Sequence, residues 1–169
     1  RTLRVLHRPG HSPSDTLFWD ERRRMVIGGD HLLAHISSNP LVSRPLDQAA
    51  DDGGGRPHAL LTYLESMEKT RSLELELVLP GHGEAITDHV SLIDERFRMH
   101  ERRARKLLRM LEPAPLSAYE LALQMWGNIA VTQAFLTISE VLGHLDLLVR
   151  DGDVAELERD GVVRFEALG

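Results

Sequence analysis

The sequence contains no cysteine, few aromatic residues and no long hydrophobic run. Without cysteine the chain can form no disulfide and no thiolate metal site, so any metal must be bound by His, Asp or Glu. No apolar stretch approaches the roughly 20 residues that a membrane helix needs, and we therefore expect no membrane span. The lack of cysteine is typical of a reducing compartment, so we expect a cytoplasmic location.

The composition is that of a globular protein with an acidic balance. Of 169 residues, 42% are hydrophobic and 27% are charged, and the net charge is −6. A negative chain is a poor partner for the phosphate backbone of nucleic acids, because that binding depends on Lys and Arg. The basic residues that gather over 96–109 are interpreted as a solvated helix face, and nucleic acid is not an expected partner.

Strand and helix signals alternate over the first hundred residues. Arg1 to His7 enters a strand at once, with no signal peptide pattern, so we expect the chain to begin within a fold. Ser37 to Gly55 is expected to be a long loop. The expected strands are Leu3–His7, Thr16–Trp19, Met25–Ile27 and Leu75–Leu79. One helix is expected from Pro57, because the apolar positions Leu60, Leu61, Leu64 and Met67 recur at helical spacing, and another is expected over Asp88–Leu111.

The last seventy residues carry a different pattern. Ser117 with Glu120 is a capping box for a helix over Ala118–Met125, and a second helix is expected over Gln133–Arg150. Asp160-Gly161 then predicts a hairpin. Helix, helix and hairpin are typical of a winged helix, so we expect two domains, 1–100 and 101–169.

Three short segments stand out as candidates for chemistry. They are Pro9-Gly10-His11, Gly28-Gly29-Asp30-His31 and Pro80-Gly81-His82-Gly83, and each follows an expected strand. A Pro-Gly pair turns the backbone sharply and allows close approach, so the next side chain projects from the sheet edge. Imidazole and carboxylate are good ligands for divalent metals, and together the segments predict a metal site.

With these motifs the sequence resembles the metallo-β-lactamase superfamily over Leu3 to about His100. The resemblance implies an α/β (α+β) fold, namely the C-terminal half of an αββα sandwich followed by the winged-helix domain. It also implies that His11, Asp30 and His82 bind metal, with Asp30 contacting both ions and serving catalysis. One or two divalent ions are expected, with zinc favoured and iron or manganese as alternatives.

The family's His-x-His-x-Asp-His motif is absent from these residues. We therefore expect the chain alone to be inactive, with an N-terminal half supplied in cis or in trans. A homodimer is also considered. His7, His31 and His35 remain candidates for supporting the ligands or contacting substrate, and simple packing or loop hydrogen bonding is the alternative for each.

Three functions are compared. The first is a metal-dependent hydrolase that uses an activated water on a small ester, thioester, lactone or related bond. The second is a metal-dependent nuclease for RNA or single-stranded DNA, with the helix over Arg96–Arg109 as its backbone track. The third is a noncatalytic interaction protein that keeps the fold.

Overall fold

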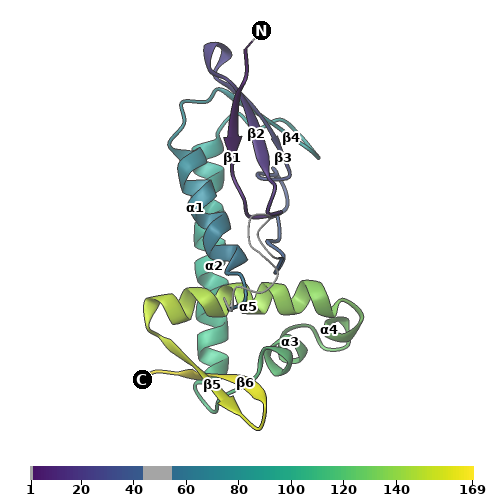
Figure 1. Ribbon diagram of the computed structural model, residues 1–169, viewed down its shortest axis with the longest axis vertical. Coiled ribbons are helices and arrows are strands. Elements are labelled where there is room, and N and C mark those ends of the chain that lie inside the picture. The colour runs from purple at the N-terminus through teal and green to yellow at the C-terminus, as the bar shows by residue number, and fades with distance from the viewer. Residues whose placement is uncertain (1, 44–54) are drawn as a thin grey trace. The chain divides into compact units, whose positions relative to one another are not determined.

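The computed structural model describes residues 2–43 and 55–169, and the loop expected over Ser37–Gly55 lies partly outside them. The chain forms two compact units, Arg1–Arg98 and Met99–Gly169. Figure 1 shows a sheet with helices in the first unit, and helices with a hairpin in the second. Within the described ranges, no helix is both long and apolar enough to cross a membrane.

A four-stranded sheet organises the first unit. Strands β1 (Arg4–His7), β2 (Thr16–Asp20), β3 (Met25–Gly29) and β4 (Leu77–Pro80) lie in the order β1-β2-β3-β4. The first three pair antiparallel, whereas β4 pairs parallel with β3. A parallel neighbour needs a crossover connection, and helix α1 (Ala59–Arg71) lies in the segment between β3 and β4.

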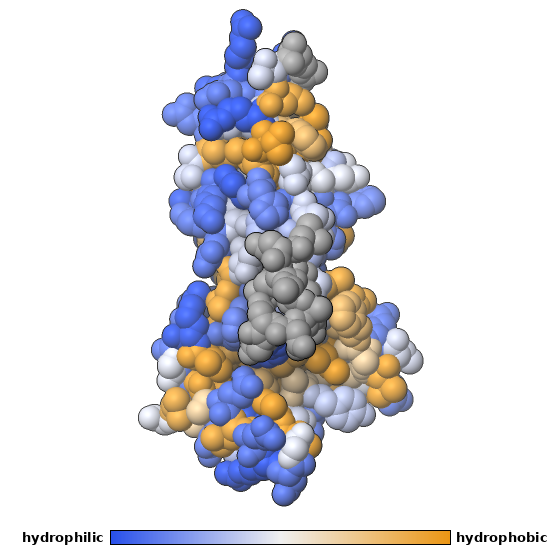
Figure 2. All heavy atoms as spheres, in the orientation of Figure 1, coloured by the Kyte–Doolittle hydropathy of each residue, from blue (hydrophilic) through white to orange (hydrophobic). Residues whose placement is uncertain are grey.

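The two faces of this sheet differ in exposure. Leu17 and Val26 on one face are fully buried. On the other face Val5 pairs with Phe18 and Phe18 with Ile27, and all three side chains are exposed. Figure 2 shows hydrophobic side chains gathered over the sheet. A sheet that is apolar on both faces is typical of one whose second face packs against another layer.

The helix expected after Pro57 is present as α1. Of its four apolar positions at helical spacing, Leu60 and Met67 are buried, whereas Leu61 and Leu64 are only half-buried. The buried positions, at helical spacing, are Leu60, Tyr63, Ser66, Met67 and Thr70. Polar residues lie on this face because their hydroxyl groups hydrogen-bond to neighbouring loops and to the helix itself. Helix α2 (His89–Leu111) follows, and the bidentate Arg71–Asp94 pair joins α1 to it.

The second unit contains the predicted helices and hairpin. Helices α3 (Ala118–Trp126) and α5 (Ala134–Asp151) flank an unpredicted short helix, α4 (Ile129–Thr132), and β5 (Val154–Arg159) pairs with β6 (Val162–Ala167). The capping box at Ser117 is present. Asp160 and Gly161 both have positive φ, as a tight hairpin turn requires. The assignment of this unit as a winged helix stays a prediction.

Candidate metal centre

The three candidate motifs meet at one edge of the sheet. Strands β1 and β3 run in the same direction, because each is antiparallel to β2, and β4 is parallel to β3. Their carboxyl ends therefore share an edge. His11 follows β1 in the turn after Pro9-Gly10, Asp30 comes directly after β3, and His82 follows β4.

Asp30 is close to both histidines. His11 Nε2 is 3.9 Å from Asp30 Oδ2, and His82 Nε2 is 3.6 Å from Asp30 Oδ1. Each carboxylate oxygen thus faces a different imidazole. The structure therefore brings His11, Asp30 and His82 together, with each histidine next to Asp30.

The turn that carries His11 is packed closely against α1. A Cβ atom at Gly10 would lie 2.5 Å from Tyr63 Cδ2 and 2.7 Å from Tyr63 Cα, so only glycine fits there. Ser66 Oγ donates to the carbonyl of Pro9 at 2.7 Å. Helix α1 therefore fixes the backbone on the N-terminal side of His11.

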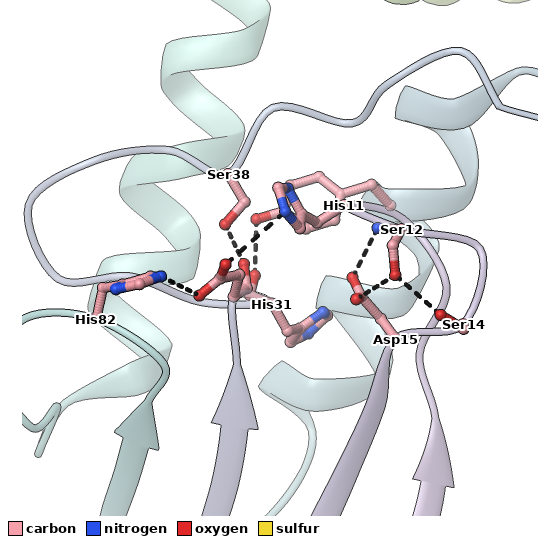
Figure 3. A network of polar contacts seen from close by, with 9 residues as sticks. His11, Ser12, Ser14, Asp15, His31, Ser38 and His82 are labelled. Carbon is pink, nitrogen blue, oxygen red and sulfur yellow. Dashed lines mark hydrogen bonds and ion pairs between the residues drawn. The ribbon is translucent and has the colours of Figure 1, made fainter.

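Asp15 closes the same turn from its other end. The backbone N–H of Ser12 donates to Asp15 Oδ2 at 3.0 Å, and Ser12 Oγ donates to Oδ1 at 2.7 Å (Figure 3). His7 also supports this turn, because its Nε2–H donates to the Pro13 carbonyl at 3.0 Å. His7 thus has the geometry of a residue that orients the turn.

The segment after β3 is held by buried donors. Tyr63 donates its hydroxyl hydrogen to the His31 carbonyl at 2.8 Å, and Ser38 donates to the carbonyl of Asp30. Thr70 Oγ1 donates to the Ser66 carbonyl, so it accepts from His31 Nε2–H at 2.9 Å. Asp30 is therefore attached to a backbone with little freedom.

His31 is neutral in this environment. Its side chain is almost fully buried, and burial lowers the pKa of His31 to about 4. Asp15 acts in the raising direction and Arg8 in the lowering direction, both more weakly. Its Nδ1 has no hydrogen-bond partner among the described residues, so a second ring proton would lack an acceptor. This burial favours a supporting role for His31 over contact with substrate.

His35 lies at the exposed end of the same loop. Its Nε2 is 3.6 Å from Glu84 Oε2, two residues beyond His82, and both side chains are largely exposed. An exposed pair of this kind contributes little to stability. The position leaves His35 accessible, and its role toward substrate stays a prediction.

The close approach of the β4 loop to Asp30 depends on Gly81. A Cβ atom there would lie 2.5 Å from Asp30 Oδ1 and 3.2 Å from the carbonyl carbon of Gly29. The Gly81 N–H donates to the Gly29 carbonyl at 2.7 Å, which joins the two loops. His82 itself is 75% exposed.

These donors fit divalent ions in their chemistry. Two ligands bound to one tetrahedral zinc at 2.0–2.1 Å lie about 3.3 Å apart, and the observed separations of 3.6 and 3.9 Å are somewhat longer than this. Each separation involves one imidazole and one carboxylate oxygen, and a closed zinc site needs four ligands. Accordingly, no group of three or more His, Cys, Asp or Glu over residues 2–43 and 55–169 is arranged to hold a metal unaided.

Several supporting residues were not found by sequence reasoning. Arg96 was assigned to a solvated basic face, and this is wrong, because only 7% of it is exposed. Its Nη2 donates to the carbonyls of Leu33 and Ala34. The signal that could have found Tyr63 and Thr70 is their helical spacing with Leu60 and Met67 on one face of α1.

Comparison with known proteins finds similarity over the region that carries these motifs. A family model described as the metallo-beta-lactamase superfamily matches residues 1–82. The chain is 34% identical to a probable metallo-hydrolase, YqjP, of Bacillus subtilis, over 97% of this chain and 50% of that protein. It is 27% identical to an atrochrysone carboxyl ACP thioesterase of Aspergillus fumigatus, over 99% of this chain and 37% of the relative. The chain thus spans half or less of these relatives.

Two solved structures share the fold. A beta-lactamase domain protein from Burkholderia ambifaria is 28% identical with a TM-score of 0.83, covering 99% of this chain and 48% of its own. A metallo-beta-lactamase family protein from Thermus thermophilus is 26% identical with a TM-score of 0.78, covering 98% of this chain and 49% of its own. The mixed α/β fold is that of these proteins. Residues 1–82 thus match the metallo-beta-lactamase superfamily, and the relatives and solved structures above carry the same similarity over nearly the whole chain.

Proposed function

We propose that the chain provides one side of the metal site of a metal-dependent hydrolase, with His11, Asp30 and His82 as ligands. The observation that carries this proposal is the carboxylate of Asp30, whose two oxygens each face a different imidazole. In this arrangement His11 and Asp30 would hold one ion, and His82 and Asp30 would hold a second. Zinc is the preferred ion for such a donor set, with iron or manganese as alternatives.

The residues of this chain bind and orient rather than attack. Bound divalent ions supply Lewis acidity and lower the pKa of water toward neutrality. Asp30 would offset part of their charge, while the two Gly-His turns hold the imidazoles at the sheet edge. Neutral His31 next to Asp30 keeps the loop in place without adding positive charge. No covalent nucleophile is needed.

The substrate class is a small ester, thioester, lactone or related bond. Among these, the similarity to a protein named as an ACP thioesterase supports a thioester. The remaining ligands would come from another segment in cis or in trans, so we expect the 169 residues alone to have little or no activity. The exposed row of Val5, Phe18 and Ile27 offers an apolar sheet face on which such a segment could pack.

The structure removes two of the basic residues on which the nuclease alternative depends. Its proposed backbone track includes Arg96, which is buried, and Arg103, which is paired with Glu140 at 2.7 Å. Only the exposed cations of α2, such as Arg102 and Arg109, remain for phosphate. The noncatalytic alternative predicts no stoichiometric metal and no effect of changing His82.

Metal content tests the proposal. The longest encoded form is purified without chelator, and its metal is measured by elemental analysis beside an Asp30→Asn variant. About two ions per chain in the wild type, with a sharp loss in Asp30→Asn, is the expected result. A Glu65→Gln variant, altered at a position of α1 outside its buried face, is the matched control and keeps the wild-type content. A well-folded wild type without metal overturns the proposal.

A further inference from the structure

The backbone after Asp30 is anchored by a charged side chain from α2. Arg96 Nη2 lies 3.2 Å from the Leu33 carbonyl oxygen and 3.0 Å from that of Ala34, and it donates to both. Hydrogen bonds from a charged donor are stronger than those between neutral groups, and burial strengthens them further. Arg96 thus joins the loop to the helix at two successive carbonyl groups.

This anchor completes a series of contacts along one short segment. Ser38 bonds to the carbonyl of Asp30, Tyr63 to that of His31, and Arg96 to those of residues 33 and 34. Leu32 and Leu33 are buried between these contacts. Four of the five carbonyl groups over residues 30–34 therefore accept a side-chain donor, and Asp30 can shift only if several of these bonds break.

We propose that Arg96 is a positioning residue for Asp30, acting through the backbone of residues 31–34. This inference rests on the proposed metal site. Arg96 touches neither Asp30 nor any ligand in the contacts above, and its effect is to hold the loop at the position where both carboxylate oxygens face an imidazole. Supporting groups of metal ligands commonly change metal affinity about 10- to 100-fold when they are removed.

The test compares Co²⁺ affinity among variants of the longest encoded form of the protein. Arg96→Met keeps the aliphatic stem and removes the donors, and Arg96→Lys keeps the charge and a single point donor. We expect Arg96→Met to weaken Co²⁺ binding at least about tenfold, measured by absorbance titration, with Arg96→Lys intermediate. Arg98→Met, on the same helix but outside its buried face, should bind Co²⁺ as the wild type does.

A second pair of variants separates positioning from general stability. Ile93→Val and Ile93→Ala remove buried atoms from the same helix and bracket the loss of stability caused by Arg96→Met. Hydrogen exchange of residues 31–35 should accelerate in Arg96→Met and stay unchanged in both Ile93 variants. If an Ile93 variant of equal stability weakens Co²⁺ binding to the same degree, Arg96 has only a structural role.

The possible failures are distinguishable. Wild-type uptake of Co²⁺ with unchanged affinity in Arg96→Met overturns the role of Arg96 and leaves the metal site intact. If the wild type takes up no Co²⁺, the proposed metal site is wrong, and the positioning role proposed for Arg96 is wrong with it. Weaker Co²⁺ binding together with faster exchange at residues 31–35 supports both.

Discussion

The two loops that approach each other at Asp30 are built differently. The loop after β3 is held by buried donors, among them Tyr63 and Arg96, and its His31 side chain is buried against Thr70. The loop after β4 is joined to it by one backbone hydrogen bond from Gly81, and its His82 is 75% exposed. One candidate ligand is thus fixed by the core, whereas the other lies at the surface.

The difference indicates how the roles are divided. A carboxylate that faces two imidazoles must hold both separations at once, so its position tolerates little error. An imidazole at the end of the site serves one position and can adjust on binding. The buried hydrogen bonds accordingly hold the backbone of the loop that carries Asp30, whereas the side chain of His82 stays accessible.

The largest expected effect separates the histidines of the two loops. His31→Ala should lower the free energy of unfolding by about 3 kcal/mol, because it leaves a cavity and removes the partner of buried Thr70. His82→Ala should change it by less than about 0.5 kcal/mol, since the side chain is exposed. Urea unfolding followed by circular dichroism measures both. Equal losses in the two variants would contradict the proposed division between the loops.

Acid should weaken the loop that carries His31. Burial lowers the pKa of His31 to about 4 from 6.5, so the unfolded chain binds this proton more readily than the folded chain does. Stability present at neutral pH is therefore lost as the pH falls through 6.5 toward 4. The loss for one such group is about 2 kcal/mol between about pH 7 and pH 5.

A second buried histidine behaves in the same direction in the other unit. Burial lowers the pKa of His144 to about 4, and its Nδ1–H donates to the Glu140 carbonyl, so its Nε2 accepts from His100 Nδ1–H.

The variant His31→Gln keeps a polar side chain that does not titrate, and it isolates the contribution of His31 to the pH dependence of stability. Its unfolding free energy should depend less on pH by about 2 kcal/mol over that range. An unchanged pH profile would show that His31 does not carry the dependence.

Local sequence signals were sufficient for most elements. Alternating apolar residues located all four strands of the first sheet within about two residues, and Ser117 with Glu120 marked the start of α3 correctly. The short helix α4 was missed, because four residues after Gly127 are too few to show helical periodicity. Local patterns predict elements well when their length spans more than one period.

The support of the site was much less predictable. His11, Asp30 and His82 stand out because each follows a strand and a glycine, and their neighbours are set by strand direction. The contacts of Arg96 with Leu33 and Ala34 join residues more than sixty positions apart. An arginine among other arginines on an amphipathic helix carries no local sign that it is buried, so tertiary packing alone decides its role.

The contact between the loops can be tested at Gly81. Gly81→Ala places a methyl group 2.5 Å from Asp30 Oδ1, so the exposed β4 loop should move away from the fixed one. We expect Co²⁺ affinity to fall about tenfold, because the spacing of His82 and Asp30 changes, while stability falls by less than about 1 kcal/mol. Gly55→Ala, where the added atom meets nothing within 4 Å, is the control. Wild-type affinity in Gly81→Ala would mean that the close approach does not set the ligand spacing.

The turn after β1 should lie between the two loops in its sensitivity to change. Ser12→Ala removes the hydroxyl bond to Asp15 Oδ1 but keeps the backbone N–H bond to Oδ2, so the turn retains one of its two closures. The expected loss of stability is about 0.5–1 kcal/mol by thermal unfolding. Asp15→Ala removes both closures and should cost more. If Ser12→Ala costs as much as Asp15→Ala, the backbone N–H bond to Asp15 Oδ2 contributes nothing and only the hydroxyl bond to Asp15 stabilises the turn.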